Sequence, residues 1–453
     1  MPLHLFDTRS RAVREFVPMG DVIGVYVCGP TVYDVPHIGN ARSAVVFDLL
    51  RRLLVREHGP VRYVRNLTDI DDKIMERAAR EGTTMEAVTS FATAAYHDAM
   101  SMLRVLPPDV EPRATEHIQD MVDMISRMVW QGAAYVSDGH VVFRAAGARG
   151  EGALTGQRTG RRAGARVSHD HASWKEKPED FVLWKPSSSD QAGWDSPWGR
   201  GRPGWHIECS AMSARYLGDV CDVHAGGSDL MAPHHENEMS QSCAAHGTDE
   251  MARYWMHNAM LTVGGRKMSK SLGNFLTIEQ AAAGVPDGMD AGAALRFLLL
   301  STHYRSLLDW SPASLTRAGD MLARWWRSIE GASHDGEVPR DALSILNQDM
   351  NVPGLMPILH RLGRTGATVS DREGLAATLR LLGLEPRVLA SRTASPTTIS
   401  PAAAHLLALR ETARKEARWG DADSIRTVLL AEHGIVLKDL PTGTEVTLRA
   451  ASP

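Results

Sequence analysis

The first residues that suit phosphate chemistry are His37, Gly39 and Asn40, in the string HIGN. They follow an apolar run, Ile23–Val27, and a Gly-Pro loop, an order that predicts a strand, a loop and a helix. The start of such a helix offers unpaired N–H groups and a positive dipole end to a phosphate. Gly39 lets a flat ligand lie against the backbone, and His37 and Asn40, one helical turn apart, can both donate hydrogen bonds to it. An ordinary helix start would explain the same residues.

Residues that suit nucleotide binding follow two later expected strands, at residues 61–65 and 220–224. Open α/β sheets bind their ligands at the carboxyl ends of strands, which makes Thr68 a candidate substrate contact. After the second strand, Gly227 allows the backbone to approach a purine or ribose, and Asp229 can accept hydrogen bonds from ribose hydroxyls. Both positions therefore fit a nucleotide site.

His234 and Glu238 stand at i and i+4 of an expected helix, so that both side chains project from one face. A histidine and a carboxylate are zinc ligand types, and two thiolates from strand ends would complete a four-ligand site. The four cysteines lie far apart in the sequence, which does not indicate a disulfide framework. Spacing alone selects no thiolate, because a buried cysteine is often only a small apolar residue.

The bulk composition is that of an ordinary globular protein long enough for two or three domains, with 453 residues, 43% hydrophobic and 23% charged. A net charge of −4 does not indicate a nucleic-acid binder, so any such contact must come from local basic patches. The N-terminus shows no apolar secretory core, and the sequence contains no apolar run of about 18 residues. We therefore expect a cytoplasmic protein that does not span a membrane.

A helical and basic insertion is expected between the two groups of strands. Periodic apolar residues predict helices throughout residues 73–131, and residues 135–143 predict a hairpin whose type I′ turn is Asp138-Gly139. The Gly- and Arg-rich residues 144–166 predict a mobile surface insertion. Its positive charge would either contact nucleic acid or merely be solvated.

After the insertion we expect a short strand at residues 204–209, a helix at 210–216 and, beyond the strand at 220–224, another strand at 256–261. The string KMSKS follows at residues 267–271, and the glycines around it permit this loop to move. Two ammonium groups on such a loop could neutralise a pyrophosphate leaving group. That role is positioning and charge stabilisation rather than covalent catalysis.

HIGN and KMSKS, in this order, resemble the paired signature motifs of class I aminoacyl-tRNA synthetases. Seven strings resemble cysteinyl-tRNA synthetases, in one sequence order: YVCGPTVYD, YVRNLTDIDDKI, DFVLWKP, RPGWHIECSAM, GGSDL, PHHENE and KMSKSLGNF. The similarity runs from residue 5 to about residue 438. The family usually has histidine where this chain has Asn40, and glycine where it has Ala225.

The resemblance implies an α/β fold with a Rossmann-like parallel-sheet catalytic domain. The implied divisions are residues 1–72 and 186–290 for the catalytic domain, 73–185 for an insertion domain, 291–390 for a helical stem and bundle, 391–401 for a Ser/Thr/Pro-rich linker and 402–453 for an anticodon-binding unit. In this last unit we expect helices at 402–419 and 422–433, then a strand. Val446 stands where the family usually has an aromatic residue suited to stacking on a base.

The resemblance also implies one zinc ion per chain, held by Cys28, Cys209, His234 and Glu238. A pocket that discriminates by shape alone prefers cysteine over serine by a factor of only ~10². Direct binding to zinc gives a larger preference, because a soft thiolate is a much better zinc ligand than a neutral hydroxyl. The implied zinc is therefore a device for selecting cysteine. The resemblance places two further residues, Trp205 and His224, in the cysteine pocket, and Cys221 and Cys243 match no ligand position.

The implied reaction is ATP-dependent activation of L-cysteine to cysteinyl-adenylate and its transfer to the 3′ end of tRNA(Cys), with Mg²⁺ accompanying ATP. Lys270 is expected as the main transition-state cation, with Lys267 helping, and His37 and Asn40 on the ATP phosphates. The remaining expected contacts to ATP or cysteine are Thr31, Gly39, Thr68, Gly227, Asp229, Ser269 and Ser271.

Two other functions remain open at this point. The chain could be a ligase that gives activated cysteine to the amine of a small sugar-like acceptor, although the tail from residue 400 onward speaks against it. It could also be a non-catalytic zinc- and RNA-binding paralogue, which the intact HIGN and KMSKS strings oppose. We expect a monomer in each case.

Overall fold

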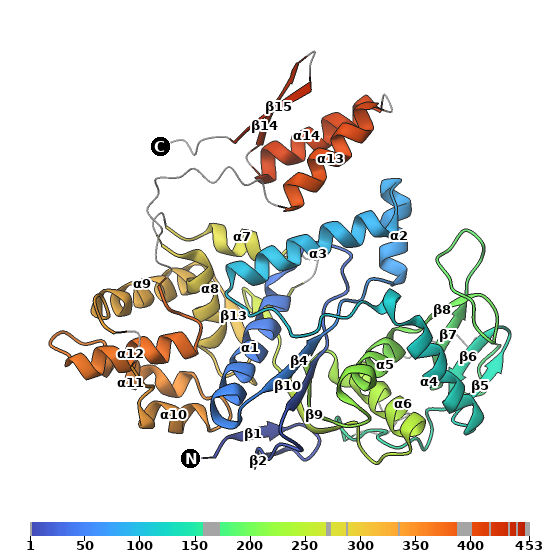
Figure 1. Cartoon of the computed structure of the whole chain (residues 1–453), viewed down its shortest axis with the longest axis horizontal. Helices are drawn as coiled ribbons and strands as arrows, with labels where there is room; N and C mark the ends of the chain where they lie inside the picture. Colours follow the sequence, from blue (N-terminus) through green and yellow to red (C-terminus); the bar gives the residue numbers. More distant parts are fainter. Residues whose placement is uncertain are drawn as a thin grey trace.

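The fold is built around a parallel sheet of four strands, in the order β10-β9-β3-β4. The labels β4, β9 and β10 mark this sheet near the middle of Figure 1. This computed structural model describes residues 2–156, 173–268, 273–286, 289–333, 336–386, 401–415, 418–433, 435–440 and 443–448. The strands are β3 (Ile23–Val27), β4 (Val61–Arg65), β9 (Cys221–Gly227) and β10 (Ala252–Asn258). Most of their residues are buried, as expected for a parallel sheet covered on both faces. Because all four strands are parallel, their carboxyl ends meet at one edge.

Helices form the connections between these strands, as parallel pairing requires. They are α1 (Ile38–His58) between β3 and β4, α5 (Trp205–Leu217) before β9, and α6 (Glu236–His246) between β9 and β10. The apolar residues of α1 recur at helical spacing, and Val46, Leu50, Leu53 and Leu54 are all buried. The predicted strands at residues 23–27 and 61–65 and the predicted start of α1 agree with this structure.

The insertion begins with α2 (Asp72–Glu81), α3 (Met85–Met102) and α4 (Ile118–Trp130). An antiparallel sheet follows, in the order β5-β6-β7-β8, made of β5 (Ala134–Ser137), β6 (His140–Phe143), β7 (Phe181–Pro186) and β8 (Gly201–Pro203). The turn between β5 and β6 has positive φ at both Asp138 (48°) and Gly139 (75°), which is the type I′ geometry. The predicted hairpin and its turn are therefore confirmed.

Two secondary-structure predictions in this half of the chain are wrong. The expected strand at residues 204–209 is the start of α5, and the strand that precedes it is β8. A short apolar run cannot be assigned by periodicity alone, and here Ile207 and Ala211 are buried at helical spacing. The expected helix over residues 73–131 is also interrupted at residues 103–117, where Pro107-Pro108 cannot continue a helix.

Part of the Gly- and Arg-rich stretch, at residues 152–155, is packed against the rest of the protein. Leu154 is only 2% exposed and lies in a buried cluster with Met239 and Trp255. Thr155 donates to Glu236 on α6 from both its backbone N–H (3.0 Å) and its hydroxyl (2.7 Å). The prediction of a surface insertion is wrong for residues 152–155, which Leu154 and Thr155 hold against the rest of the protein, whereas Arg149 is exposed. Residues 157–166 lie outside the described residues.

The C-terminal half is mainly helical, as predicted, with one small sheet that was not predicted from the sequence. That sheet has the order β12-β11-β13 and consists of β11 (Leu261–Val263), β12 (Arg266–Lys267) and β13 (Leu308–Trp310). The helices are α7 (Ile278–Ala283), α8 (Ala291–Leu300), α9 (Pro312–Ser328), α10 (Arg340–Leu346), α11 (Met356–Leu362) and α12 (Val369–Leu381). Among the described residues, no helix is long and apolar enough to cross a membrane.

The last unit contains two helices and a hairpin, and α13 lies beside α3 of the insertion (Figure 1). Its elements are α13 (Pro401–Lys415), α14 (Trp419–His433), β14 (Ile435–Leu440) and β15 (Gly443–Leu448). Trp419 begins the second helix, so the expected first helix over 402–419 is too long. The expected linker lies outside the described residues except for Pro401, which begins α13, and the domain boundaries stay predictions.

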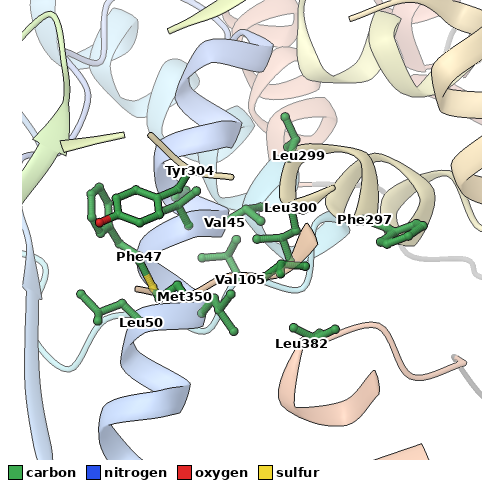
Figure 2. Close-up of a cluster of buried hydrophobic side chains, with 14 of the residues drawn as sticks. Val45, Phe47, Leu50, Val105, Phe297, Leu299, Leu300, Tyr304, Met350 and Leu382 are labelled. Atoms are coloured by element: carbon green, nitrogen blue, oxygen red, sulfur yellow. The ribbon is translucent and has the colours of Figure 1, made fainter. Parts of the chain in front are cut away.

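A hydrophobic core joins α1 to the helices of the C-terminal half. Figure 2 shows part of it, with the labelled side chains Val45, Phe47, Leu50, Val105, Phe297, Leu299, Leu300, Tyr304, Met350 and Leu382.

One buried ion pair lies beside this core, between Asp48 on α1 and Arg296 on α8. Asp48 also accepts hydrogen bonds from Arg52 (2.8 Å) and from the backbone N–H of Leu106 (2.8 Å). Burial raises the pKa of Asp48, but Arg296 and Arg52 outweigh it and hold this pKa below its usual value.

Replacing Asp48 with alanine should destabilise the protein strongly, because the buried Arg296 would lose its carboxylate partner. We expect a decrease of about 3–5 kcal/mol in the free energy of unfolding, measured by urea denaturation followed by circular dichroism. The control is Glu81→Ala, which removes the exposed pair between Glu81 and Arg77 on α2 and should cost less than about 1 kcal/mol. Equal losses in the two variants would contradict the importance of the buried pair.

Candidate active site

A cavity of about 390 Å³ lies at the edge where the strands of the parallel sheet end. The loop after β3, the first turns of α1 and residues that follow β9 and β10 line it. The expected site residues in its wall are Cys28, Thr31, His37, Gly39, Asn40, Trp205, Gly227, Asp229 and Lys267. Ser269, Lys270 and Ser271 lie outside the described residues.

The start of α1 is organised by its own side chains. His37 is the N-cap residue, and its Nδ1 accepts a hydrogen bond from the backbone N–H of Gly39 (3.1 Å). Asn40 completes a capping box, because its Oδ1 accepts from the backbone N–H of His37 (3.0 Å). With Nδ1 and Oδ1 used as acceptors, the other polar ends of these side chains, Nε2–H and the amide NH₂, are donors. The cap therefore gives the helix start the donors that an anionic phosphate requires.

Gly39 cannot be replaced by a larger residue without disturbing this cap. A Cβ at position 39 would lie 2.8 Å from both Cε1 and Nδ1 of the His37 ring. It would also lie 3.4 Å from Cε of Met268, the second residue of KMSKS. The HIGN turn and the beginning of the KMSKS loop are therefore neighbours, although some 230 residues separate them.

The segment after KMSKS also pairs with the start of α1. Ile38 donates its backbone N–H to Leu276 (3.1 Å), and Ile278 donates to Pro36 (3.1 Å). The ring of Phe275 lies edge-on to His37, with ring centroids 5.2 Å apart. Lys267, at the end of β12, is exposed and lines the same cavity. The two motifs thus face one cavity, which allows them to act on the same ligand.

A cluster of four potential metal ligands lies next to this cavity. The ligand atoms of Cys28, Cys209, His234 and Glu238 are all within 4.8 Å of one another. Oε1 of Glu238 is 2.9 Å from Nε2 of His234 and 3.5 Å from Sγ of Cys28. The four side chains are buried, with exposed fractions of 8% or less. Two sulfurs, one nitrogen and one oxygen at these separations form a donor set that fits a tetrahedral zinc ion.

Four different elements position the ligands. Cys28 directly follows β3, His234 lies in a π-helical turn, Met231–His235, and Glu238 lies in the first turns of α6. Cys209 comes from α5, not from a strand end as expected. Trp205, at the start of α5, stacks on the His234 ring with centroids 4.1 Å apart and an interplanar angle of 24°. This indole therefore lies beside the cluster and, like Cys28, lines the cavity.

The cluster contains buried groups of opposite charge. Burial raises the pKa of Glu238, but His234 and His224 outweigh it and hold this pKa well below its usual value. Burial likewise lowers the pKa of His234, yet Glu238 and Cys209 raise it to about 10. A hydrogen bond from Cys28 lowers the pKa of Cys209 to about 6, against the effect of burial. A protonated His234 therefore balances part of the negative charge that Glu238 and Cys209 carry.

Two other buried histidines, His224 and His235, form a second group of potential metal ligands with the same Cys28 and Glu238. His224 Nε2 lies 3.1 Å from Oε2 of Glu238 and 3.5 Å from Sγ of Cys28. His235 Nε2 is 4.0 Å from Glu238 Oε1 and has no hydrogen-bond partner among the described residues. Its Nδ1 pairs with His257 Nε2 (2.8 Å), and His257 pairs with Thr8 (2.8 Å). These two hydrogen bonds in series fix the ring of His235 so that its Nε2 points at the ligand cluster.

His235, His257 and Thr8 were not predicted as site residues from the sequence. The adjacent pair His234-His235 was a signal for the first, but nothing in the sequence connects the other two to the cluster. His206 was also missed, and its Nδ1 lies 2.8 Å from Nδ1 of His234. Burial lowers the pKa of both His206 and His257 to about 3, so these rings stay neutral.

Thr68 lies behind the cavity rather than in its wall. It is 1% exposed and exchanges backbone hydrogen bonds with the loop after β3, to Pro30 (3.1 Å) and from Val32 (3.0 Å). Its hydroxyl accepts from Asn66 (3.3 Å), whose Oδ1 accepts from the backbone N–H of Gly29 (2.9 Å). Asn66, a polar residue directly after a strand, was also missed. Thr68 and Asn66 therefore hold the loop that carries Cys28 and Thr31.

Comparisons with known families agree with this geometry. Residues 16–320 match the family described as tRNA synthetases class I (C) catalytic domain, and residues 397–446 match the family described as cysteinyl-tRNA ligase anticodon binding domain. The cysteine–tRNA ligase of Rhodospirillum rubrum is 46% identical over 462 aligned residues, which cover 98% of this chain and 99% of the relative. That of Beijerinckia indica is 44% identical over 459 residues and covers 98% of each.

Solved structures show the same fold at low sequence identity. Methionyl-tRNA synthetase of Mycobacterium tuberculosis, in complex with methionyl-adenylate, has a TM-score of 0.54 at 16% identity and covers 80% of this chain and 89% of its own. LeuRS of Agrobacterium radiobacter K84, in a ternary complex with tRNA and LeuAMS, has a TM-score of 0.56 at 13% identity, covering 82% and 84%. The full-length identity to cysteine–tRNA ligases decides the family. The chain belongs to the cysteine–tRNA ligases, within the class I aminoacyl-tRNA synthetases.

Proposed function

We propose that this protein activates L-cysteine with ATP and transfers it to the 3′ end of tRNA(Cys), and that a bound zinc ion selects cysteine. The observation that carries this proposal is the position of the cluster of Cys28, Cys209, His234 and Glu238, directly beside the cavity that the HIGN turn lines. If the carboxylate of an amino-acid substrate lies near the hydrogen-bond donors at the start of α1, its side chain can reach a metal ion at that position. Full-length similarity to cysteine–tRNA ligases supports the choice of cysteine.

Zinc fits the donor set best, because thiolate, imidazole and carboxylate are its usual ligands. When bound, it would offer a coordination position that a substrate thiolate fills and a neutral hydroxyl does not. The residues of the chain hold the ion and exclude bulk water, since all four ligands are buried. His224 packs against Cys28 and Glu238 and fixes their orientation, and Trp205 supplies the apolar wall of the pocket.

The activation step requires positive charge and hydrogen-bond donors around the phosphates of ATP. The donors of His37 and Asn40 bind the phosphates, while Gly227 and Asp229 hold the adenosine. The cysteine carboxylate attacks the α-phosphorus, the bond to the β-phosphate breaks, and pyrophosphate leaves with Mg²⁺. Lys270 and Lys267 stabilise the charge that develops on this leaving group. A hydroxyl of the terminal ribose of tRNA then attacks the cysteinyl carbonyl, and AMP leaves.

Contact with tRNA is assigned to the C-terminal unit. Residues 397–446 match an anticodon-binding family, and α13, α14 and the β14–β15 hairpin form this unit. Val446 lies in β15 opposite Leu437, so this position of the hairpin carries no aromatic ring for stacking. We further propose that the protein acts as a monomer in the cytoplasm.

The match of the C-terminal unit favours tRNA over a small amine acceptor. An acceptor assay separates the two, because an amino-sugar ligase would transfer cysteine to the amine and leave tRNA unmodified. A non-catalytic paralogue would show no cysteine-dependent exchange of pyrophosphate into ATP. Residues of HIGN and Lys267 line the same cavity, which favours a catalytic protein over a non-catalytic paralogue.

Changing Cys209 to serine should remove zinc and the selection of cysteine, because serine supplies no thiolate. We expect zinc content, measured by elemental analysis, to fall from one per chain to a small fraction of that value. The preference for cysteine over serine in pyrophosphate exchange should fall to ~10², the level that shape alone gives.

The matched control is Cys221→Ser, which changes another buried cysteine that lies outside the cluster. This control should keep its zinc. Full zinc content in Cys209→Ser would contradict the ligand assignment.

Removing the ammonium group of Lys270 should slow activation without weakening the binding of cysteine. We expect Lys270→Ala to lower kcat of cysteine-dependent pyrophosphate exchange by on the order of 10²-fold, because the charge on the leaving group loses its main partner. KM for cysteine should change less than about threefold. Lys177→Ala, which removes an exposed lysine outside the cavity wall, is the control. An unchanged kcat in Lys270→Ala would refute the assigned role.

A further inference from the structure

Arg42 is a buried cation in the wall of the active-site cavity. It lies on α1, five residues after His37, and its side chain is 0% exposed. Its guanidinium donates to three backbone carbonyls, those of Met260 (2.7 Å), His303 (3.3 Å) and Ser306 (2.5 Å). These carbonyls are dipoles and cannot neutralise a full positive charge.

No carboxylate forms an ion pair with Arg42 in the part of the chain that the structure describes, and its Nε has no hydrogen-bond partner there. Burial lowers the pKa of Arg42 to about 10, so the group stays charged at neutral pH. Arg296 on α8 is an informative contrast. It is equally buried and donates to the carbonyls of Leu382, Leu103 and Arg104, but it also pairs with Asp48.

A buried charge without a counter-ion is costly, and proteins generally pair such groups or use them. The field of a buried charge is weakly screened, so it reaches an anion several ångströms away more strongly than a surface charge does. The cavity beside Arg42 is the one to which we assign ATP. A bound triphosphate would therefore supply the missing negative charge.

We propose that Arg42 provides a fixed positive charge that binds the phosphates of ATP, and especially the leaving pyrophosphate. This inference rests on the proposed function, because that function places a triphosphate in the cavity. Arg42 differs from Lys267, which is exposed. Three hydrogen bonds fix the position of Arg42, so this side chain does not need to reorganise when the ligand arrives. The phosphate site then has a rigid cation on α1 in addition to the lysines that we assign to it from the KMSKS motif.

The alternative is a purely structural role. The contacts of Arg42 join α1 to Met260, just before β11, and to residues 303–306, just before β13. If these contacts alone mattered, losing them would disturb the whole cavity. Adenosine, which has no phosphate, would then lose affinity as much as ATP does.

The test compares Arg42→Met, which removes the charge, with Arg42→Lys, which keeps it. Equilibrium binding to the full chain is measured for ATP, inorganic pyrophosphate and adenosine, with circular dichroism as the check of folding. We expect Arg42→Met to weaken ATP and pyrophosphate by on the order of 10- to 100-fold and to leave adenosine nearly unchanged. Arg42→Lys keeps a positive charge but not every hydrogen bond of the guanidinium, so it should lose less affinity for ATP and pyrophosphate than Arg42→Met does. If Arg42→Met does not fold, Arg42→Gln takes its place.

The control is the double variant Arg296→Met with Asp48→Asn, which removes the other buried arginine together with its counter-ion. It should bind pyrophosphate like the wild type. Wild-type pyrophosphate affinity in folded Arg42→Met, or equal losses of ATP and adenosine in both Arg42 variants, would overturn the inference. A wild-type protein that binds no ATP would instead overturn the proposed function itself.

Discussion

The parallel pairing of β3 with β9 is the constraint on which the site depends. It places Tyr26 opposite His224, whose rings stack with centroids 5.1 Å apart, and Val27 opposite Ala225. The ladder continues one residue further, because the backbone N–H of Cys28 donates to Ala225 (3.0 Å). A slip of one residue would turn the side chain of His224 to the opposite face of the sheet and away from Cys28. The register of these two strands therefore fixes the distance between Cys28 and His224, which lie some 200 residues apart in the sequence.

The parts of the fold that local signals determine could be predicted from the sequence. The strands β3 and β4, the start of α1 and the turn at Asp138-Gly139 each follow from a pattern within a few residues. The start of α5 could not be predicted in this way, because the run around Ile207 suits a strand as well as a helix. The packing of Leu154 also escaped prediction, since its partners Met239 and Trp255 are about a hundred residues away and only the tertiary structure brings them together.

The candidate site, like the fold, could be predicted only in part from the sequence. Residue types at the carboxyl ends of strands pointed to a nucleotide site, but only the resemblance to a known family selected Cys28 and Cys209 from four cysteines. All four are buried, so burial does not separate them either. Their pKa values do differ: burial raises the pKa of Cys221 to about 12, whereas a hydrogen bond from Cys28 lowers that of Cys209 to about 6. Such effects depend on neighbours in space, which no single sequence reveals.

Asn40 shows how a local structural requirement and a functional one can be met by the same side chain. The family usually has histidine at this position, and the charge of a histidine is absent here. The structure shows that the residue also caps α1, through the hydrogen bond from the backbone N–H of His37 to its Oδ1. Because this bond consumes the carbonyl end, it orients the amide so that its other end is a donor. The cap therefore retains a neutral donor at this position, and the positive charge of the phosphate site must come from other residues, among which Arg42 is the one held rigidly on the same helix.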